Sequence, residues 1–301
     1  VPVPKKAGVP NPTVTMNAAS MNNSGFEFSA TYRNRDHDFK YEVSANLSTL
    51  RNRVTSLGFG TDSYISGSYI TKVGQEIGQF YGWVYEGIAR TQEDLDNHAT
   101  QEGAQIGDCL YKDVNNDGKV DSEDQVVLGS GMPKINFGLN ARFEYKRFDL
   151  SIATFGALNY HVSDDIYNSL NSCYGWGNKE VGMLEANRFS EDGSTYLSNV
   201  PRTYVTNSAS LGWNDLFSSR KIQNAAYWKI ANVELGYNFP DKWFGKYVSD
   251  VRFYVSAQNL HTFTGYHGYN VDYAGGTFTP GYNFCSYPTA RTFMCGVHFT
   301  F

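Results

Sequence analysis

The feature that most constrains this chain is a two-residue alternation of apolar and polar side chains at its end. Over residues 292–301 every second residue is apolar, and the residues between are largely polar. Side chains of a β-strand point alternately to opposite faces, so this segment is predicted to be a strand with one apolar face. A terminal strand frays unless something holds it, so it should pair within a sheet. The apolar positions are Phe293, Cys295, Val297, Phe299 and Phe301.

The same alternation recurs upstream. A polar turn at residues 34–38 joins the first two such segments and predicts a β-hairpin. A tight reversal at 146–147 predicts a second hairpin. The runs reach about 9–11 residues, longer than the usual 5–6 of soluble sheets. We predict an all-β, antiparallel chain of roughly eight to ten strands. The clearest segments are 26–33, 39–48, 136–146, 148–152, 232–239 and 251–258.

Two environments could cover the apolar faces. In a soluble β-sandwich they would form the core, whereas in a transmembrane β-barrel they would face lipid and the polar faces would line a watery lumen. A strand needs about 9–11 residues to cross a bilayer. Short and long connections also alternate, as the periplasmic turns and outer loops of outer-membrane barrels do. The short ones are 34–38, 146–147 and 240–250; the long ones are 161–221 and 261–289.

The barrel interpretation is favoured, and the final Phe resembles the last residue of bacterial outer-membrane β-barrel proteins. The alternative is a self-contained β-sandwich or small barrel that binds carbohydrate and carries a structural calcium loop. A formal net charge of −5 gives no reason to expect nucleic-acid binding. Mean hydropathy is −0.44, but averaging misses apolar residues placed at every second position.

The start of the chain predicts a piece of a longer polypeptide. The first residue is Val1 rather than Met, no signal peptide follows, and four prolines fall within residues 1–12. The four cysteines show no CxxC spacing, so free thiols are favoured over a disulfide framework. One short helix is predicted over residues 91–99, with Thr91 as its N-cap.

Residues 113–124 carry the sharpest local motif. Oxygen-bearing side chains stand at positions 1, 3, 5, 9 and 12 of this stretch, with Gly118 at position 6, which is the pattern of a calcium-binding loop. An aspartate stands at position 12, where an EF-hand has glutamate, and a solvated acidic turn is the alternative. We predict a structural Ca²⁺ ion held by Asp113, Asn115, Asp117, the backbone carbonyl of Lys119, Asp121 and Asp124.

No catalytic constellation stands out, so no enzymatic activity is predicted. Neither a Ser/His/Asp set nor a phosphate-binding loop is visible, and the six histidines lack metal-ligand spacing. Aromatic residues gather in the long connections, and those next to strands are interpreted as an interfacial girdle. Rings in the later connections could contact a ligand or a partner protein. These are Tyr174, Trp176, Tyr266, Tyr269 and Tyr273.

Several segments together resemble one family. In order along the chain they read GQEIGQFYGWVYEGI, GDCLYKDVNNDG, GMPKINFG and VRFYVSAQNLHTFT, followed by the ending YPTARTFMCGVHFTF. As a set, they are similar to the C-terminal third of SusC/RagA-type TonB-dependent outer-membrane transporters of the Bacteroidetes. The segments span residues 74–88, 107–118, 131–138, 251–264 and 287–301.

The resemblance implies a barrel of about 22 strands filled by a plug domain. It also implies a SusD-like surface lipoprotein as a lid, and import of glycan fragments or peptides energised through TonB. Residues 1–301 would then be the C-terminal part of the barrel, with the plug, the TonB-contacting segment and the first strands supplied by an N-terminal remainder. The acidic loop at 113–124 recurs in this family, and the outer faces of the strands would meet outer-membrane lipid.

Overall fold

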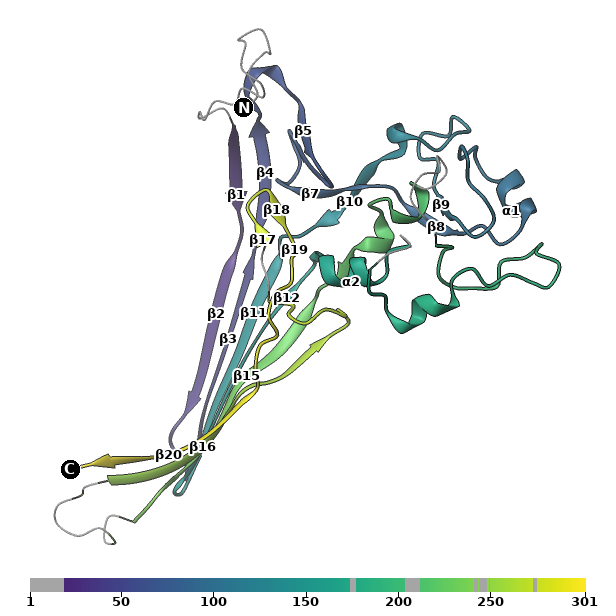
Figure 1. Ribbon diagram of the computed structural model, residues 1–301. Coiled ribbons are helices and arrows are strands. Elements are labelled where there is room, and N and C mark those ends of the chain that lie inside the picture. The colour runs from purple at the N-terminus through teal and green to yellow at the C-terminus, as the bar shows by residue number, and fades with distance from the viewer. Residues whose placement is uncertain are drawn as a thin grey trace, which may run out of the picture.

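The computed structural model describes residues 19–173, 177–203, 212–240, 243, 248, 250–272 and 275–301. Its main element is one antiparallel sheet of seven strands (Figure 1). This confirms the predicted all-β antiparallel class. In their order across the sheet, the strands are β2 Glu27–Asn34, β3 Phe39–Thr49, β11 Ile135–Tyr145, β12 Phe148–Leu158, β15 Tyr227–Asn238, β16 Asp250–Thr264 and β20 Thr292–Thr300.

The seven strands stand side by side in the same order as they occur in the chain. Because each pair of neighbours is antiparallel, the connections between them alternate between the two ends of the sheet. The short connections after β2, β11 and β15 lie at one end, here called the turn end, where β20 also finishes. The long connections 50–134, 159–226 and 265–291 lie at the opposite end, here called the loop end (Figure 1). The predicted separation of short and long connections is confirmed.

One face of the sheet, here called the outer face, is apolar and uncovered. Leu235, Val255 and Val297 on this face are 42–49% exposed. Within the described ranges no second sheet packs on it, and β2 and β20 are both edge strands. The described residues therefore form neither a β-sandwich nor a small closed barrel. An uncovered apolar surface of this extent is typical of a face that contacts a membrane or another protein.

Aromatic rings border the outer face at both ends. At the loop end Trp228 of β15 stacks on Phe263 of β16, with ring centroids 5.3 Å apart. At the turn end Phe148 of β12 packs on Tyr237 of β15 at 4.8 Å. Membrane β-barrels carry such aromatic belts on both sides of their apolar band.

The opposite face of the sheet, here called the inner face, is polar. Arg252 of β16 reaches across β15 to Asp149 of β12, and its Nε lies 3.0 Å from the Asp149 Oδ1. The same guanidinium lies 2.8 Å from Glu234 Oε1. Gly236 makes room for this crossing, because a Cβ at that position would come within 2.4 Å of the Arg252 guanidinium. Ion pairs that link β12, β15 and β16 thus replace apolar packing on this part of the face.

The long connections fold into short strands and turns at the loop end. They form a four-stranded sheet β10-β7-β6-β5, a three-stranded sheet β14-β13-β19 and the pairs β8–β9 and β17–β18, and their strand β4 pairs with β1, which precedes β2 in the chain. No helix of the described part is long and apolar enough to cross a membrane. The strand bounds are β1 Ser20–Ser24, β4 Arg51–Ser56, β5 Ser63–Ser66, β6 Tyr69–Lys72, β7 Gln79–Gly82, β8 Tyr85–Ile88, β9 Cys109–Tyr111, β10 Val126–Ser130, β13 His161–Asp164, β14 Gln223–Asn224, β17 Gly275–Gly276, β18 Thr279–Pro280 and β19 Tyr282–Asn283. The helical turns are α1 Gln92–Asn97, α2 Asp165–Leu170, and the 3₁₀ turns η2 Gly58–Gly60, η3 Ser122–Asp124, η4 Val181–Glu185, η5 Trp213–Asp215 and η6 Ser219–Lys221.

The helix predicted after Thr91 is present as α1. Its capping box is complete, since Thr91 Oγ1 accepts from the Asp94 amide at 3.3 Å and Asp94 Oδ2 accepts from the Thr91 amide at 2.9 Å. Helix α2 was not predicted. The predicted eight to ten strands undercount the twenty that form within the described residues. The missed strands have two to six residues, too few for an alternation to stand out.

Candidate functional site

The long connections pack on the inner face of the sheet at the loop end. Ala157 of β12 lies on the same face as Asp149 and is buried in an apolar cluster built by the connections. The other members of that cluster are Tyr160, Val162, Ala225, Tyr266 and Val271. The connections therefore cover the polar side of the sheet and leave its outer face free.

An ion pair fixes the connection 265–291 to β15. Lys229 lies opposite Phe155 on the inner face and is 5% exposed. Its ammonium lies 2.5 Å from Asp272 Oδ2 and 5.8 Å from the centre of the Phe155 ring. A buried charge is tolerated only when paired, so this contact holds the connection over the sheet.

A second buried polar contact joins two of the long connections. Asp164 accepts hydrogen bonds from the Tyr266 hydroxyl and, at 3.1 Å, from Asn283 Nδ2. It also caps α2 through the Tyr167 amide at 2.9 Å. Tyr266 is 6% exposed, which corrects the prediction that it contacts a ligand or partner. Its ring fills the core because its hydroxyl finds a buried carboxylate as its partner.

The described parts of residues 83–124 and 165–222, here called the loop unit, have a small core of their own. Cys109, Tyr111 and Val120 are buried there, with Trp83 and Tyr85 packed against them. Phe80, just before this unit, is fully buried. Phe80 is therefore a core residue, and Trp83 and Tyr85 pack against the core of the loop unit.

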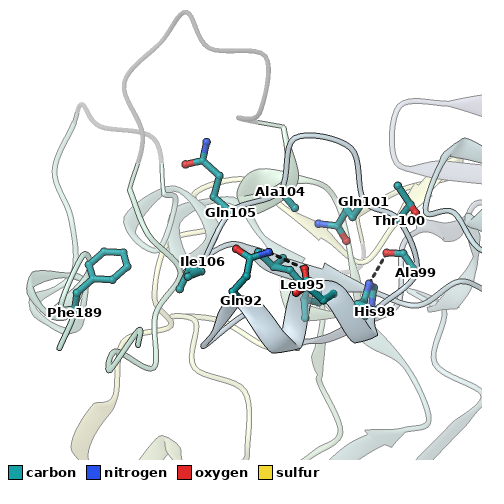
Figure 2. Close-up of a pocket in the computed structure, with 12 residues that line it drawn as sticks. Gln92, Leu95, His98, Ala99, Thr100, Gln101, Ala104, Gln105, Ile106 and Phe189 are labelled. Carbon is teal, nitrogen blue, oxygen red and sulfur yellow. Dashed lines mark hydrogen bonds between the residues drawn. The ribbon is translucent and has the colours of Figure 1, made fainter. Parts of the chain in front are cut away.

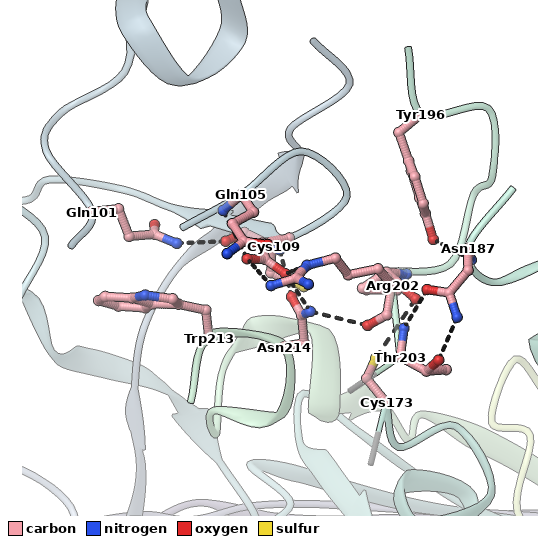
Figure 3. A network of polar contacts seen from close by, with 12 residues as sticks. Gln101, Gln105, Cys109, Cys173, Asn187, Tyr196, Arg202, Thr203, Trp213 and Asn214 are labelled. Atoms are coloured by element: carbon pink, nitrogen blue, oxygen red, sulfur yellow. Dashed lines mark hydrogen bonds and ion pairs between the residues drawn. The ribbon is translucent and has the colours of Figure 1, made fainter. Parts of the chain in front are cut away.

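A buried carboxylate draws three segments of the loop unit together (Figure 3). Asp108 is fully buried and accepts from Arg202 Nε at 2.5 Å and from Arg202 Nη2 at 3.0 Å. It also accepts from Asn214 Nδ2 at 2.7 Å and from the Gln105 amide at 2.8 Å. Asn214 in turn accepts from the Cys109 amide at 2.7 Å. Both carboxylate oxygens are thus fully engaged, so the network is structural rather than reactive.

The predicted calcium loop is a tight turn whose side chains bind its own backbone. Asp113 accepts from the amides of Asn116 at 2.7 Å and Gly118 at 2.8 Å. Asn115 accepts from the Asp117 amide at 2.9 Å, and Asp117 accepts from the Lys119 amide at 2.9 Å. Positive φ angles at Asn116 (60°) and Gly118 (86°) make this curvature possible.

Asp124 closes the loop from inside the protein. It is fully buried and accepts from the amides of Val114 at 2.8 Å, Asn115 at 3.3 Å and Asp121 at 2.9 Å. Burial raises the pKa of Asp124, but the three amide donors outweigh burial and hold the pKa below its usual value. Across the described residues, no group of three or more His, Cys, Asp or Glu side chains is placed to hold a metal ion. The backbone turn suits a cation, whereas the carboxylates do not converge on one point, so calcium stays a prediction.

The remaining predicted contact residues are dispersed. Tyr174, Trp176 and Tyr273 lie outside the described residues. Tyr269 is 66% exposed at the loop end, where a ligand or partner can reach it. All four cysteines are free in the structure, with Cys109 and Cys173 buried.

A pocket of about 610 Å³ opens on the loop unit between α1 and Phe189 (Figure 2). Some of its polar side chains already have partners within the protein. Gln92 donates to Asp96 at 2.8 Å, and Gln101 bonds both the Cys109 carbonyl and the Tyr111 amide. These contacts stabilise the walls of the recess.

No family model matches the chain. It is 29% identical to TonB-dependent receptor P3 of Formosa agariphila over its whole length. It is 25% identical to TonB-dependent receptor SusC of Bacteroides thetaiotaomicron over 97% of its length. The chain spans 30% and 27% of these two relatives, respectively.

Solved structures give the same answer for the fold. The RagAB peptide transporter superposes with a TM-score of 0.78 at 21% identity, over 99% of this chain and 31% of that one. The "open-open" state of the RagAB peptide importer gives 0.74 at 23% identity, over 100% and 31%. The named relatives are receptors and transporters rather than enzymes. The chain is thus similar to SusC/RagA-type TonB-dependent transporters, of which it matches somewhat less than a third of the length.

Proposed function

We propose that this chain forms part of the barrel wall and the extracellular loops of an outer-membrane importer. The observation that carries the proposal is the division of the sheet into two faces. The outer face is apolar, uncovered and bordered by aromatic rings, as a lipid-facing surface is. The inner face is lined by ion pairs and is covered at the loop end by the connections, as a gated lumen would be.

The partners follow from the relatives. A SusD-like surface lipoprotein would sit on the loop end, where the exposed Tyr269 offers a contact. Energy would come through TonB. The substrate would be a glycan fragment or a peptide; the RagAB structures are named for peptide transport, and SusC is a TonB-dependent receptor. The remainder of the polypeptide would complete the barrel beside the edge strands β2 and β20.

The test of import uses the native host and its complete gene. Cells lacking the gene, cells complemented with it and complemented cells treated with a protonophore are given fluorescent hexasaccharides and hexapeptides in parallel. We expect at least one probe class to enter the complemented cells alone, and the protonophore to stop its entry. Equal uptake by the deletion strain and the complemented strain would contradict the proposal.

We further propose that residues 113–124 hold a structural Ca²⁺ ion. Val120 anchors this loop in the core of the loop unit, and Trp83 Nε1 donates to the Asp121 carbonyl at 3.0 Å. Asp113, Asn115 and Asp117, with the Lys119 carbonyl, would offer oxygen ligands, and Asp121 and Asp124 would turn toward the ion when it binds. A hard cation would then neutralise the clustered carboxylates.

Elemental analysis of gently dialysed protein tests the calcium proposal. Asp117→Ala combined with Asp121→Ala should abolish a stoichiometric calcium content and increase proteolysis within residues 113–124. The matched control is Asp192→Ala, which removes an exposed carboxylate of another loop. Unchanged calcium in the double variant would refute the assignment.

A further inference from the structure

Arg220 is a half-buried cation without a counter-charge in the loop unit. It lies in the 3₁₀ turn η6, which is fixed beside β8. The Ser219 amide donates to the Trp83 carbonyl at 3.0 Å, and the Tyr85 amide donates to the Ser219 hydroxyl at 3.0 Å. Within the described part of the chain, the Arg220 guanidinium forms neither a hydrogen bond nor an ion pair. A charge withdrawn from water needs a partner, so this group lacks an acceptor.

The side chains that interact most strongly with the Arg220 guanidinium are all neutral. They are Cys173, Cys109, Tyr85 and Tyr111. Burial is the largest effect on these four groups and raises the pKa of each, so the thiols and hydroxyls stay protonated at neutral pH. None of them therefore supplies the negative charge that Arg220 lacks.

Two carboxylates of this region, Asp108 and Asp215, are already paired with other cations. Asp108 accepts from Arg202 Nε at 2.5 Å and from Arg202 Nη2 at 3.0 Å. The Asp215 carboxylate lies 3.6 Å from Lys221 Nζ. With these two pairs balanced, the charge of Arg220 remains unbalanced.

A second donor without an acceptor lies near Arg220. The Tyr85 hydroxyl forms no hydrogen bond with a described residue, and its ring packs edge-on against Tyr111 at 6.4 Å. The charges of Arg220 and Arg90 both act on this hydroxyl and lower its pKa against the larger effect of burial. Tyr85 and Arg220 are half-buried, and neither the hydroxyl nor the guanidinium belongs to the unpartnered polar atoms that are closed to solvent. A small solute can therefore reach both groups.

We propose that Arg220 and Tyr85 form a binding site for a small tetrahedral oxyanion, phosphate or sulfate, that stabilises the loop unit. The planar guanidinium matches two oxygens of such an anion, and the Tyr85 hydroxyl would donate to a third. The anion would supply the missing negative charge and would join β8 to η6, two elements far apart in the sequence. Because this role concerns the stability of the connections, it is independent of the proposed import function.

Limited proteolysis of the purified full-length protein in detergent tests the site. The buffers contain sodium chloride, phosphate or sulfate at equal ionic strength, and the readout is the rate of cleavage within residues 177–203 of the loop unit. We expect phosphate or sulfate to slow this cleavage about tenfold relative to chloride once its concentration is ten times its Kd. Arg220→Gln should abolish the protection. Arg188→Gln, at an exposed position of the same unit, is the matched control and should keep it.

The comparison between these two variants is decisive, because phosphate and sulfate also stabilise proteins through exclusion from their surfaces, and that effect acts on both variants alike. Calorimetric titration with phosphate measures the Kd directly, and Arg220→Gln should raise it at least about tenfold.

Tyr85→Phe keeps the test valid should Arg220→Gln disturb the fold, because the hydroxyl that it removes has no partner among the described residues. This variant should be cut at the unchanged rate in chloride and should bind phosphate more weakly than the unchanged protein. The proposal is overturned if neither anion protects the unchanged protein beyond chloride, or if Arg220→Gln and Tyr85→Phe are protected as well as Arg188→Gln.

Discussion

At the scale of single residues, the loop unit depends on one carboxylate. Asp108 is fully buried and accepts hydrogen bonds from Arg202, Asn214 and the Gln105 amide. These partners come from segments about a hundred residues apart in the sequence. A buried charge is costly when one of its partners is removed, so this group decides whether the segments stay together.

Arg202→Met should loosen the loop unit. The change leaves the Asp108 carboxylate buried with only neutral donors, which costs roughly 3–5 kcal/mol. We expect limited proteolysis to cut residues 177–203 much faster than in the unchanged protein, while the sheet stays resistant. Arg188→Met, at an exposed position of the same segment, is the control, and the protease should cut this variant at the same rate as the unchanged protein. Equal rates for the two variants would show that the ion pair is dispensable.

The buried cysteines should resist alkylation. Burial is the largest effect on both thiols, and it raises the pKa of Cys109 to about 12 and of Cys173 to about 11. Only the thiolate reacts, so at pH 8 about one Cys109 in ten thousand is reactive even before access is considered. Mass spectrometry after iodoacetamide should find Cys285 labelled and Cys109 unlabelled between pH 7 and 9. Rapid labelling of Cys109 in folded protein would contradict the packing described for the loop unit.

At the scale of elements, the alternation predicts which residues of a strand tolerate charge. Val233 and Asn232 are neighbours in β15, yet Val233 pairs with Ile152 on the outer face and Asn232 pairs with Ala153 on the inner face. Arginine on a lipid-facing strand position near the bilayer centre costs about 2–4 kcal/mol, whereas arginine on a lumen face is far better tolerated.

Val233→Arg should therefore impair membrane assembly, and Asn232→Arg should not. The measurement is the fraction of full-length protein that is heat-modifiable on gels of outer-membrane extracts. We expect a strong reduction for Val233→Arg and a near-normal fraction for Asn232→Arg. The opposite ranking would mean that the two faces of the sheet have been exchanged.

The long strands and their faces were predictable from the sequence, because ten or so alternating residues make a pattern that few other structures produce. The capping of α1 by Thr91 was also predictable, because the cap forms between residues that are close in the sequence. The role of Tyr266 was not, since its partner Asp164 lies in another connection and its burial depends on tertiary packing.

At the scale of the whole molecule, the two ends of the sheet should face different compartments. The turn end carries only short connections and the loop end carries the three long ones. The proposed orientation places the loop end outside the cell and the turn end in the periplasm. The same orientation would expose Tyr269 to a surface partner.

Epitope tags test this orientation in the full-length protein. A tag after Tyr269 should bind antibody on intact cells, and a tag between Lys146 and Arg147 should bind only after the outer membrane is permeabilised. An untagged strain and total-lysate blots control for background and expression. Surface staining of the tag at 146–147 would reverse the proposed orientation.

The short connections also have a kinetic consequence. Each joins two long strands, so β2–β3, β11–β12 and β15–β16 are three hairpins whose paired strands are close together in the sequence. Joining one hairpin to the next requires closing the connections 50–134 and 159–226, and loop-closure entropy opposes that step. We expect the hairpins to zip early and the sheet to assemble from them afterwards. The long connections would then determine the rate at which the sheet is completed, in addition to contacting ligands or partners in the assembled protein.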